Sequence, residues 1–261
     1  MDWGMENRLA RIIRPDTGRV VMLAVDHGYF LGPTTGLEDL RATVSPLLPY
    51  ADTLMLTRGM LRRCVDPKKS APVMLRMSGG NSILTELSNE GLTCAVEDAV
   101  RLNVAGITLS IYVGSPHEHQ TLINLGRLVD EGEARGIPVM AVTAVGKDMV
   151  RDVRYLGLCC RIAAEIGCHM VKTYYCEDFP KLVASTPVPV VIAGGKKLPE
   201  PDALELAANA VRDGAAGVDM GRNIFQSEAP TAMIQAVRAI VHENASPKQA
   251  IEMYRDLKAS K

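Results

Sequence analysis

Residues 154–176, RYLGLCCRIAAEIGCHMVKTYYC, contain one full unit of the pattern that organises this chain. Segment 154–166 carries apolar residues at helical spacing, and Gly167 follows it, where a helix commonly ends on a left-handed residue. The run 170–173 then has the length of a buried strand. The unit therefore predicts a helix, a turn and a strand that carries Lys172 near its carboxyl end.

Short apolar runs alternate with helical segments along the whole sequence. The eight runs cover residues 20–25, 53–57, 72–77, 106–111, 137–143, 170–173, 188–193 and 217–220. Alternating strands and helices predict a parallel sheet, and eight units in 261 residues favour closure into a (β/α)8 TIM barrel. An open doubly wound sheet is the alternative, although no G-x-G-x-x-G motif follows the first run.

Two helical segments lie outside this pattern, at residues 4–13 and 247–257. We expect additional N- and C-terminal helices on a single TIM-barrel domain spanning residues 1–261, because no linker or low-complexity stretch divides the chain. Ser115 and Ser246 each begin a capping-box motif with proline next, which predicts helices that start at residues 116 and 247.

Charge and hydropathy exclude several classes of partner. The 29 basic and 30 acidic residues are mixed along the chain and give a net charge of −1, so no footprint for nucleic acid is visible. The apolar runs are too short to cross a bilayer, so no membrane partner is expected. Small molecules and other copies of the chain are the expected partners.

The cysteines and the first residues indicate the cytoplasm. Six cysteines without C-x-x-C spacing predict reduced thiols with packing roles, not a disulfide framework. The first 14 residues contain three arginines and are typical of an amphipathic helix, not of a secretory signal.

The carboxyl ends of parallel barrel strands meet at one mouth, where such barrels hold their active sites. Lys172 is the sharpest candidate there, because a lysine in a partly apolar pocket can act as a neutral amine and form a Schiff base with a ketone. Asp26, at the end of the first strand, is the candidate carboxylate partner. Tyr174 or a water is the candidate proton relay. The alternative is a strand-end lysine that reaches solvent or pairs with an acid.

Glycine-bearing turns after the last two strands predict a phosphate site. Gly194, Gly195 and Gly221 leave backbone N–H groups uncovered at the place where barrels often bind phosphate. Arg222 adds paired donors, and Lys196 adds a point charge. The alternative is that the glycines only turn the chain and that Arg222 pairs with an acid.

Weaker features lie near the same mouth. The pair Asp26–His27 lacks a third ligand at fixed spacing, so no metal is predicted and His27 is kept as a possible substrate contact. The loop 78–82 is either a cover for the substrate or an ordinary turn. Lys147 and Asp148 are predicted to form a structural ion pair.

Several contiguous stretches resemble one enzyme family. AVDHG (24–28), VKTYY (171–175), AGGKK (193–197) and MGRNIFQ (220–226) resemble the archaeal-type class I fructose-bisphosphate aldolases over nearly the whole chain. MLAVDHGYFLGPTTGLE (22–38) and AVTAVGKDMVRD (141–152) are more similar to one branch, the thiolases that complete degradation of the phosphorylated quorum-sensing signal autoinducer-2. Members of that branch carry additional residues before this N-terminus.

The resemblance implies a TIM-barrel enzyme with Lys172 as its Schiff-base lysine, Asp26 as the carboxylate beside it, and a substrate phosphate on 194–195 and 221–222. For the thiolase branch it implies a phosphorylated dione as substrate and coenzyme A as co-substrate, with no permanently bound cofactor. The products are acetyl-CoA and dihydroxyacetone phosphate. It also implies a homo-oligomer, often a ring of ten subunits. One departure is Ala144, which stands where the family aldolases have a tyrosine acid or base; the thiolase branch lacks that tyrosine too.

Two other functions remain open on these residues. One is a class I aldolase that cleaves a sugar phosphate such as fructose 1,6-bisphosphate, and the other is a barrel that binds a phosphorylated ligand without catalysis. The sequence shows no adenine pocket for coenzyme A. Its basic stretch of Arg62, Arg63, Lys68 and Lys69 is either a contact for the coenzyme A phosphates near the mouth or a solvated face.

Overall fold

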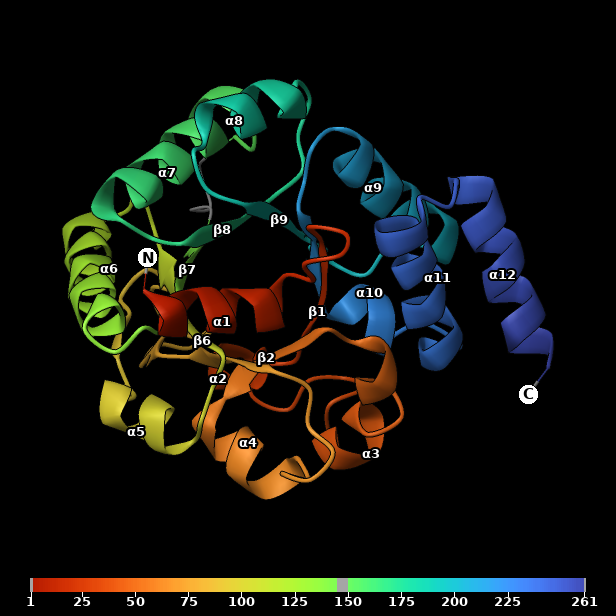
Figure 1. Cartoon of the computed structure of the whole chain (residues 1–261), viewed down its shortest axis with the longest axis horizontal. Helices are drawn as coiled ribbons and strands as arrows, with labels where there is room; N and C mark the ends of the chain where they lie inside the picture. Colours follow the sequence, from red (N-terminus) through yellow and green to blue (C-terminus); the bar gives the residue numbers. More distant parts are fainter. Residues whose placement is uncertain (1, 145–149, 261) are drawn as a thin grey trace.

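Eight parallel strands close into a barrel in the order β1-β10-β9-β8-β7-β6-β3-β2 in the computed structural model, which describes residues 2–144 and 150–260 (Figure 1). The strands are β1 (Val20–Ala24), β2 (Thr53–Thr57), β3 (Val73–Arg76), β6 (Gly106–Ile111), β7 (Val139–Thr143), β8 (Met170–Thr173), β9 (Val190–Ala193) and β10 (Gly217–Met220). Four have the predicted bounds, three are shorter by one or two residues at one end, and β3 is shorter by one residue at each end. The predicted TIM barrel is therefore confirmed.

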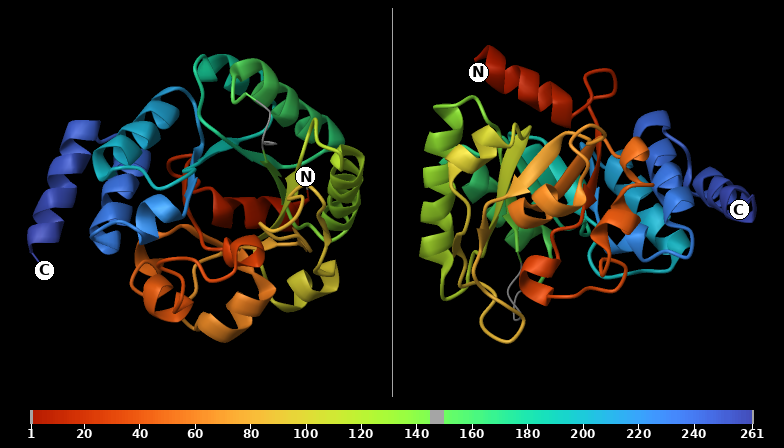
Figure 2. Two further views of the ribbon diagram at one scale, coloured as in Figure 1. Left: turned by 180° about the vertical axis from the view of Figure 1, so that it is seen from behind. Right: turned by 90° about the horizontal axis from the view of Figure 1, so that it is seen from below.

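Helices surround the barrel, and most of them cover its outer face (Figures 1 and 2). They are α2 (Gly28–Leu31), α3 (Leu40–Val44), α4 (Arg58–Cys64), α5 (Val96–Arg101), α6 (Glu118–Glu133), α7 (Val153–Ile166), α8 (Phe179–Ser185), α9 (Glu200–Arg212), α10 (Arg222–Phe225) and α11 (Pro230–Glu243), with a 3-10 turn at Leu48–Tyr50. Gly167 ends α7 in the left-handed conformation, as its place in the sequence predicted.

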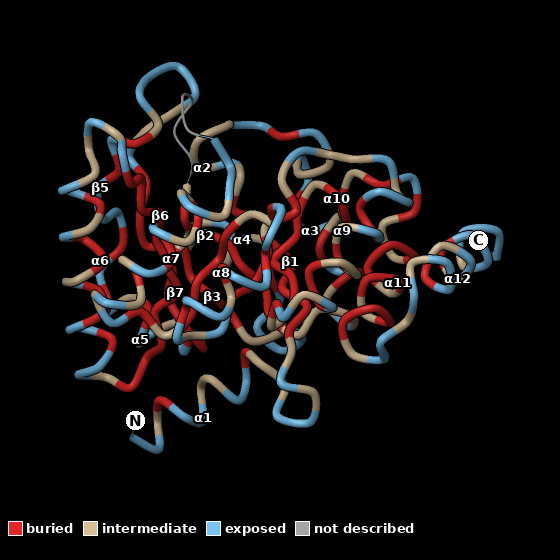
Figure 3. Tube along the Cα trace, turned by 90° about the horizontal axis from the view of Figure 1, so that it is seen from above, coloured by how far each residue is buried: buried red, intermediate tan, exposed pale blue. Residues whose placement is uncertain are grey.

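The core has two apolar layers that share the same strands. Inside the barrel, the buried side chains include Met22, Met55, Met74, Met140 and Met170. The alternate residues of each strand, such as Leu23 of β1, face the surrounding helices and are also buried (Figure 3). Burial on both faces explains why most residues of the strands are apolar.

The two predicted additional helices occupy different places. Helix α1 (Trp3–Ile12) crosses the amino-terminal end of the barrel, where Ile12 is fully buried and Thr53 Oγ1 donates to the Ile12 carbonyl at 3.3 Å. Helix α12 (Pro247–Ala259) packs outside the ring on α9 and α11. The right view of Figure 2 shows α1 at one end of the barrel and the loop around residue 84 at the other, so α1 does not cover the carboxyl ends of the strands.

One of the two predicted capping boxes is confirmed. Ser246 caps α12, its hydroxyl accepting from Gln249 N and the Gln249 side chain accepting from Ser246 N. The prediction at Ser115 is wrong, because α6 begins only at Glu118. There the Ser115 hydroxyl donates to the carbonyl of Tyr112 at 2.7 Å and so closes a turn before the helix.

A small hairpin rises beside the mouth. Strand β4 (Ser78–Gly79) pairs antiparallel with β5 (Gly91–Leu92), and Ile83 N donates to Phe30 O at 3.0 Å. The loop 78–82 is therefore the start of a hairpin, not an ordinary connection from strand to helix. The predicted ion pair of Lys147 and Asp148 lies outside the described residues.

The basic stretch does not lie near the mouth. Arg62 lines a surface hollow together with Arg11 of α1 and Pro72, which precedes β3. These neighbours place the segment at the amino-terminal end of the barrel. The expectation that it faces the mouth is wrong, because α4 starts at the mouth and the chain then returns to the opposite end.

Candidate active site

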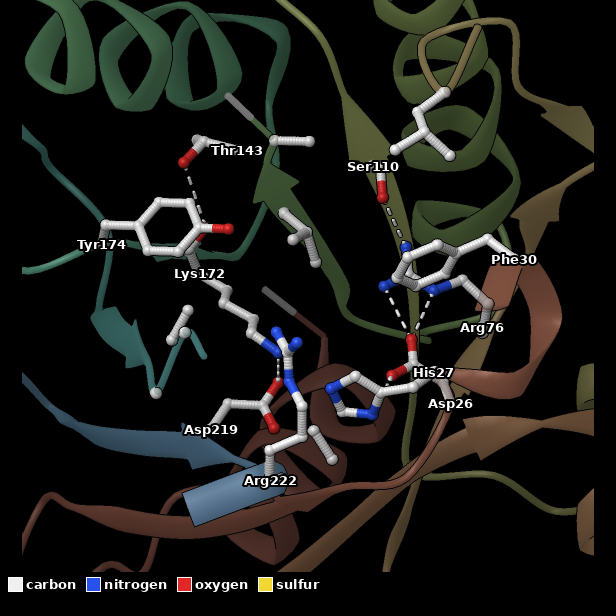
Figure 4. A pocket seen from close by; sticks show the side chains of 18 of the residues that line it. Asp26, His27, Phe30, Arg76, Ser110, Thr143, Lys172, Tyr174, Asp219 and Arg222 are labelled. Atoms are coloured by element: carbon white, nitrogen blue, oxygen red, sulfur yellow. Dashed lines mark hydrogen bonds and ion pairs between the residues drawn. The ribbon is translucent and has the colours of Figure 1, made fainter. Parts of the chain in front are cut away.

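A cavity of about 300 Å3 opens at the carboxyl ends of the barrel strands. The predicted residues that line it are Asp26, His27, Lys172, Tyr174, Gly194, Gly195, Gly221 and Arg222 (Figure 4). They come from segments far apart in the sequence, and closure of the barrel brings them together.

Lys172 points into this cavity and contacts a carboxylate that the sequence did not predict. The residue is 8% exposed, and its Nζ lies 2.8 Å from Oδ2 of Asp219. Through β9, Lys172 is level with Gly217 of β10, so Asp219 lies two residues nearer the mouth on the same face of its strand. A lysine side chain spans that offset.

Asp26 is paired differently from the prediction. Arg76 holds its Oδ2 with Nε at 2.9 Å and with Nη2 at 2.8 Å, and Nη1 of Arg76 donates to Ser110 Oγ at 2.9 Å. The expected direct pairing of Asp26 with Lys172 is therefore wrong, because a guanidinium fork occupies that carboxylate. Asp26 still shares the cavity with Lys172.

The two buried carboxyl groups have opposite pKa shifts. Burial by itself would raise the pKa of Asp26, but the charges of Arg76, His27 and Lys172 outweigh it and hold that pKa below its usual value. Burial raises the pKa of Asp219, and the charge of Lys172 opposes the shift only in part. Asp26 is thus the carboxyl group that ionises more readily, and Asp219 is the one that takes up a proton more readily.

His27 lies between the two ends of the cavity and is neutral at physiological pH. Burial lowers its pKa to about 4, with Asp26 opposing the shift and Lys172 and Arg222 adding to it. Its Nδ1 is 4.0 Å from Oδ1 of Asp26 and is buried without a hydrogen-bond partner among residues 2–144 and 150–260. His27 lines the cavity, and its contact with a substrate stays a prediction.

Replacing His27 by glutamine is expected to flatten the loss of stability in mild acid. The folded-state pKa of about 4 lies below the ordinary value of 6.5, so the unfolded chain binds more protons between them and stability falls as the pH falls below 6.5. Between pH 7 and pH 5 the wild-type unfolding free energy should drop by about 2 kcal/mol more than that of His27→Gln. Urea titrations of both proteins at the two pH values measure this difference; parallel pH dependences would contradict it.

Backbone and a free guanidinium form the other end of the cavity. A Cβ on Gly221 would lie 2.3 Å from the Ala24 carbonyl oxygen, so only glycine fits there, and Gly195 has φ +70°. Arg222 Nε is buried and has no hydrogen-bond partner in the described part of the chain. A buried donor without a partner in a cationic, glycine-lined end suits an anion such as phosphate.

Lys196 is the predicted residue that the structure does not bring to the site. It is exposed and does not line the cavity, so its prediction as a phosphate contact is wrong for this arrangement. The turn directs Gly194 and Gly195 inward, and the next side chain faces solvent.

The rim of the cavity carries an aromatic and a cation. Tyr174 lines the wall, and the guanidinium of Arg151 lies 3.8 Å from the centre of its ring. Ala144 also lines the cavity and offers no acidic proton. The cavity wall at residue 144 therefore has no side chain that can act as an acid or base.

The sequence reasoning missed the roles of Arg76 and Asp219. Each is a charged residue in an otherwise apolar strand, the last of VMLR and the third of GVDM, and this was the available signal. Glu90 carried no such signal. It is buried and accepts from Tyr29 at 2.7 Å and from Ser78 at 2.6 Å, which anchors the hairpin to the cavity wall.

The described residues contain no candidate metal site, membrane-spanning helix or disulfide. Residues 2–144 and 150–260 contain no cluster of three or more histidine, cysteine, aspartate or glutamate side chains that could hold a metal ion. None of the helices described is both long and apolar enough for a membrane span. All six cysteines are free, and burial raises the pKa of Cys160 and Cys168 to about 12, which fits packing roles.

Comparison with protein families identifies the barrel. The family model described as DeoC/LacD family aldolase matches residues 20–227, from the first residue of β1 to just beyond α10. The chain belongs to the DeoC/LacD aldolase family. It is accordingly an enzyme, and the resemblance noted in its motifs is confirmed.

Similar members of the DeoC/LacD family cover almost the whole chain. A protein of Photorhabdus laumondii named 3-hydroxy-5-phosphonooxypentane-2,4-dione thiolase is 58% identical over 97% of this chain and 88% of its own length. A protein with the same name from Yersinia pseudotuberculosis is 57% identical over the same shares. An uncharacterized aldolase of Pasteurella multocida is 57% identical over 99% of this chain and 89% of its own.

Solved structures of fructose-bisphosphate aldolases show the same barrel. A Schiff-base-forming fructose-1,6-bisphosphate aldolase superposes with a TM-score of 0.81 at 26% identity, over 91% of this chain and 99% of the other. An archaeal fructose-1,6-bisphosphate aldolase, whose catalytic lysine is covalently bound to a carbinolamine intermediate, gives the same values. A fructose-bisphosphate aldolase of Slackia heliotrinireducens, with a TM-score of 0.86 at 18% identity over 97% of this chain and 90% of its own, shows the fold alone.

Proposed function

We propose that this enzyme is a thiolase that moves the acetyl group of 3-hydroxy-5-phosphonooxypentane-2,4-dione to coenzyme A in the catabolism of phosphorylated autoinducer-2. The observation that carries the proposal is Lys172, a buried amine inside a cavity whose far end is lined by Gly195, Gly221 and Arg222. The 58% identity to a protein named for this activity supports the same substrate.

The amine of Lys172 forms the Schiff base that later accepts the electron pair of the breaking carbon–carbon bond. Its neutral form adds to the ketone beside the phosphooxymethyl group, and loss of water gives a protonated Schiff base. Arg222 and the glycine turns hold the phosphate, so binding energy from a remote group positions the reacting carbon.

Coenzyme A then accepts the acetyl group. Its thiolate adds to the methyl ketone, and collapse of that adduct breaks the bond to the neighbouring hydroxyl-bearing carbon. The electron pair of the broken bond moves into the Schiff base and leaves an enamine, while acetyl-CoA departs. Protonation of the enamine carbon and hydrolysis release dihydroxyacetone phosphate and restore Lys172.

A direct assay tests the proposal. The purified protein is incubated with the dione phosphate, with and without coenzyme A, and acetyl-CoA and dihydroxyacetone phosphate are quantified. Equal amounts of both products that depend on coenzyme A support the thiolase. Binding of the dione phosphate without turnover in the presence of coenzyme A would overturn the proposal and favour a non-catalytic phospho-ligand barrel.

A class I aldolase is the second candidate, favoured by the structural similarity to Schiff-base fructose-1,6-bisphosphate aldolases. The same cavity would hold dihydroxyacetone phosphate as an enamine, but Ala144 gives no acid or base for the hydroxyl of a leaving aldehyde. Rapid cleavage of fructose 1,6-bisphosphate without coenzyme A would select the aldolase instead.

Replacing Arg222 by alanine is expected to raise KM for the dione phosphate about 10- to 100-fold, with a smaller effect on kcat, because charge-assisted hydrogen bonds to the phosphate are lost. Steady-state kinetics measure the change. Arg212→Ala, at an exposed arginine of α9, is the matched control and should leave KM unchanged. An unchanged KM in Arg222→Ala would contradict the phosphate anchor.

The compartment and assembly belong to the same proposal. Bacterial coenzyme A is cytoplasmic, and six free cysteines suit a reducing compartment, which supports a cytoplasmic enzyme.

Exposed apolar residues on helices, Trp3 at 79% and Leu158 at 53%, support contacts between copies of the chain. Sedimentation equilibrium measures the subunit number, for which ten is the expected value from the resemblance.

A further inference from the structure

The carboxylate of Asp219 has hydrogen-bond acceptor sites that no described residue fills. Its side chain is completely buried, and Lys172 Nζ at 2.8 Å is the cation beside it. Apart from the Lys172 ammonium at Oδ2, neither carboxyl oxygen has a hydrogen-bond partner within the described residues. Stabilising buried ion pairs normally fill their remaining acceptor sites with hydrogen bonds, and this carboxylate does not.

The other titratable and charged groups near Asp219 include Asp26, Arg76, Arg222 and His27, and each differs from it in contacts or charge. Asp26 is tied to Arg76, and Arg222 faces the phosphate end. His27 is neutral at physiological pH because burial lowers its pKa to about 4. Among these groups, only Asp219 both touches the reacting nitrogen and has an environment that favours its protonated form.

We propose that Asp219 is the catalytic acid and base of the Schiff-base steps, taking a proton from Lys172 and returning one to the oxygen that leaves as water. This inference rests on the proposed function, because it assumes that Lys172 condenses with a ketone.

The protons balance over the cycle. The carboxylate of Asp219 takes one proton from the Lys172 ammonium, and the free amine adds to the ketone carbon. The added nitrogen gives a proton to the new alkoxide, and the resulting hydroxyl leaves as water with the proton from Asp219. The nitrogen lone pair forms the C=N bond, so a protonated Schiff base and an ionised Asp219 remain.

The variant Asp219→Asn distinguishes this catalytic role from the role of a counter-ion, because the two roles predict opposite changes in the rate of Schiff-base formation. If Asp219 only kept Lys172 protonated, its removal would free the amine and speed condensation. If Asp219 transfers the protons, its removal slows loss of water from the carbinolamine. We expect the second result, a fall of about 100-fold in the rate of Schiff-base formation.

The experiment follows Schiff-base formation with dihydroxyacetone phosphate as the probe and borohydride as the trap, and reads the reduced adduct by intact-protein mass spectrometry from pH 6 to pH 9. Asp219→Asn should be slow at neutral pH and slow further with rising pH, because loss of water from the carbinolamine then depends on proton donors in solution. Asp219→Glu should recover part of the rate. Asp213→Asn, a carboxylate that accepts from Tyr175 outside the cavity, is the matched control.

The outcomes distinguish this inference from the proposed function. No adduct on the wild-type protein would overturn both. A wild-type adduct with equal or faster trapping in Asp219→Asn would overturn the role of Asp219 and leave the Schiff base standing. Calorimetry of inorganic phosphate binding at the Arg222 end checks that each variant is folded. If Asp219→Asn fails this check, the rate of Schiff-base formation in Asp219→Glu is measured instead. A folded Asp219→Glu that forms no Schiff base would overturn the role of Asp219.

Discussion

Acetyl-CoA formation should fall by about 10⁴-fold or more in Lys172→Met, because the variant keeps the length of the side chain but has no amine to form the Schiff base. The same variant should give no borohydride-dependent adduct with dihydroxyacetone phosphate. The barrel interior already holds methionines at neighbouring levels, including Met170 on the same strand, so this side chain is compatible with the site.

Lys172→Met also changes the environment of Asp219. Without its cationic neighbour, burial and the charge of Asp26 raise the pKa of Asp219 and only the charge of Arg76 opposes them, so the group should become neutral and the fold should survive. Lys181→Met, at a lysine of α8 whose side chain is 72% exposed, is the control for the loss of a lysine and should retain activity. Acetyl-CoA formation within tenfold of wild type in Lys172→Met would end the Schiff-base mechanism.

Arg76→Met is expected to lower the free energy of unfolding by about 3–5 kcal/mol, because it leaves the carboxylate of Asp26 buried without its partner. The side chains of Arg76 and Asp26 are 5% and 6% exposed, so water cannot replace the guanidinium. Ser110 loses its donor as well. Urea-induced unfolding at pH 7 measures the loss.

The pH dependence gives a second measurement of the same pair. In the wild type the pKa of Asp26 is lowered on folding, so its contribution is present above the ordinary pKa and is lost as the pH falls through the folded-state value. Arg76→Met removes the main charge that lowers this pKa, so the variant should lose less stability in acid than the wild type.

A double variant and a matched control complete the experiment. Arg76→Met/Asp26→Asn should recover part of the lost stability, since no buried charge then lacks a partner. Arg62→Met, which breaks a partly exposed pair with Asp98, should cost less than about 1 kcal/mol. A similar loss in Arg62→Met and Arg76→Met would contradict the role given to burial.

Much of this protein followed from local patterns in the sequence. Most residues of the buried strands are apolar, and Gly167 ends a helix because its backbone must be left-handed. Such features depend on neighbours in the chain, so strand bounds at 106–111 and 170–173 were predicted without error. Closure of the barrel then required the carboxyl ends of the strands to meet, which placed Lys172, Arg222 and Gly221 in one cavity.

The pairing of charges inside that cavity was decided only by the tertiary structure. From sequence alone, Asp26 was the expected partner of Lys172, but Arg76 reaches Asp26 and the lysine meets Asp219. These contacts depend on how far each strand is displaced along its neighbours and on the reach of long side chains. No local pattern encodes those distances, because they arise from the stagger of eight strands around a closed cylinder.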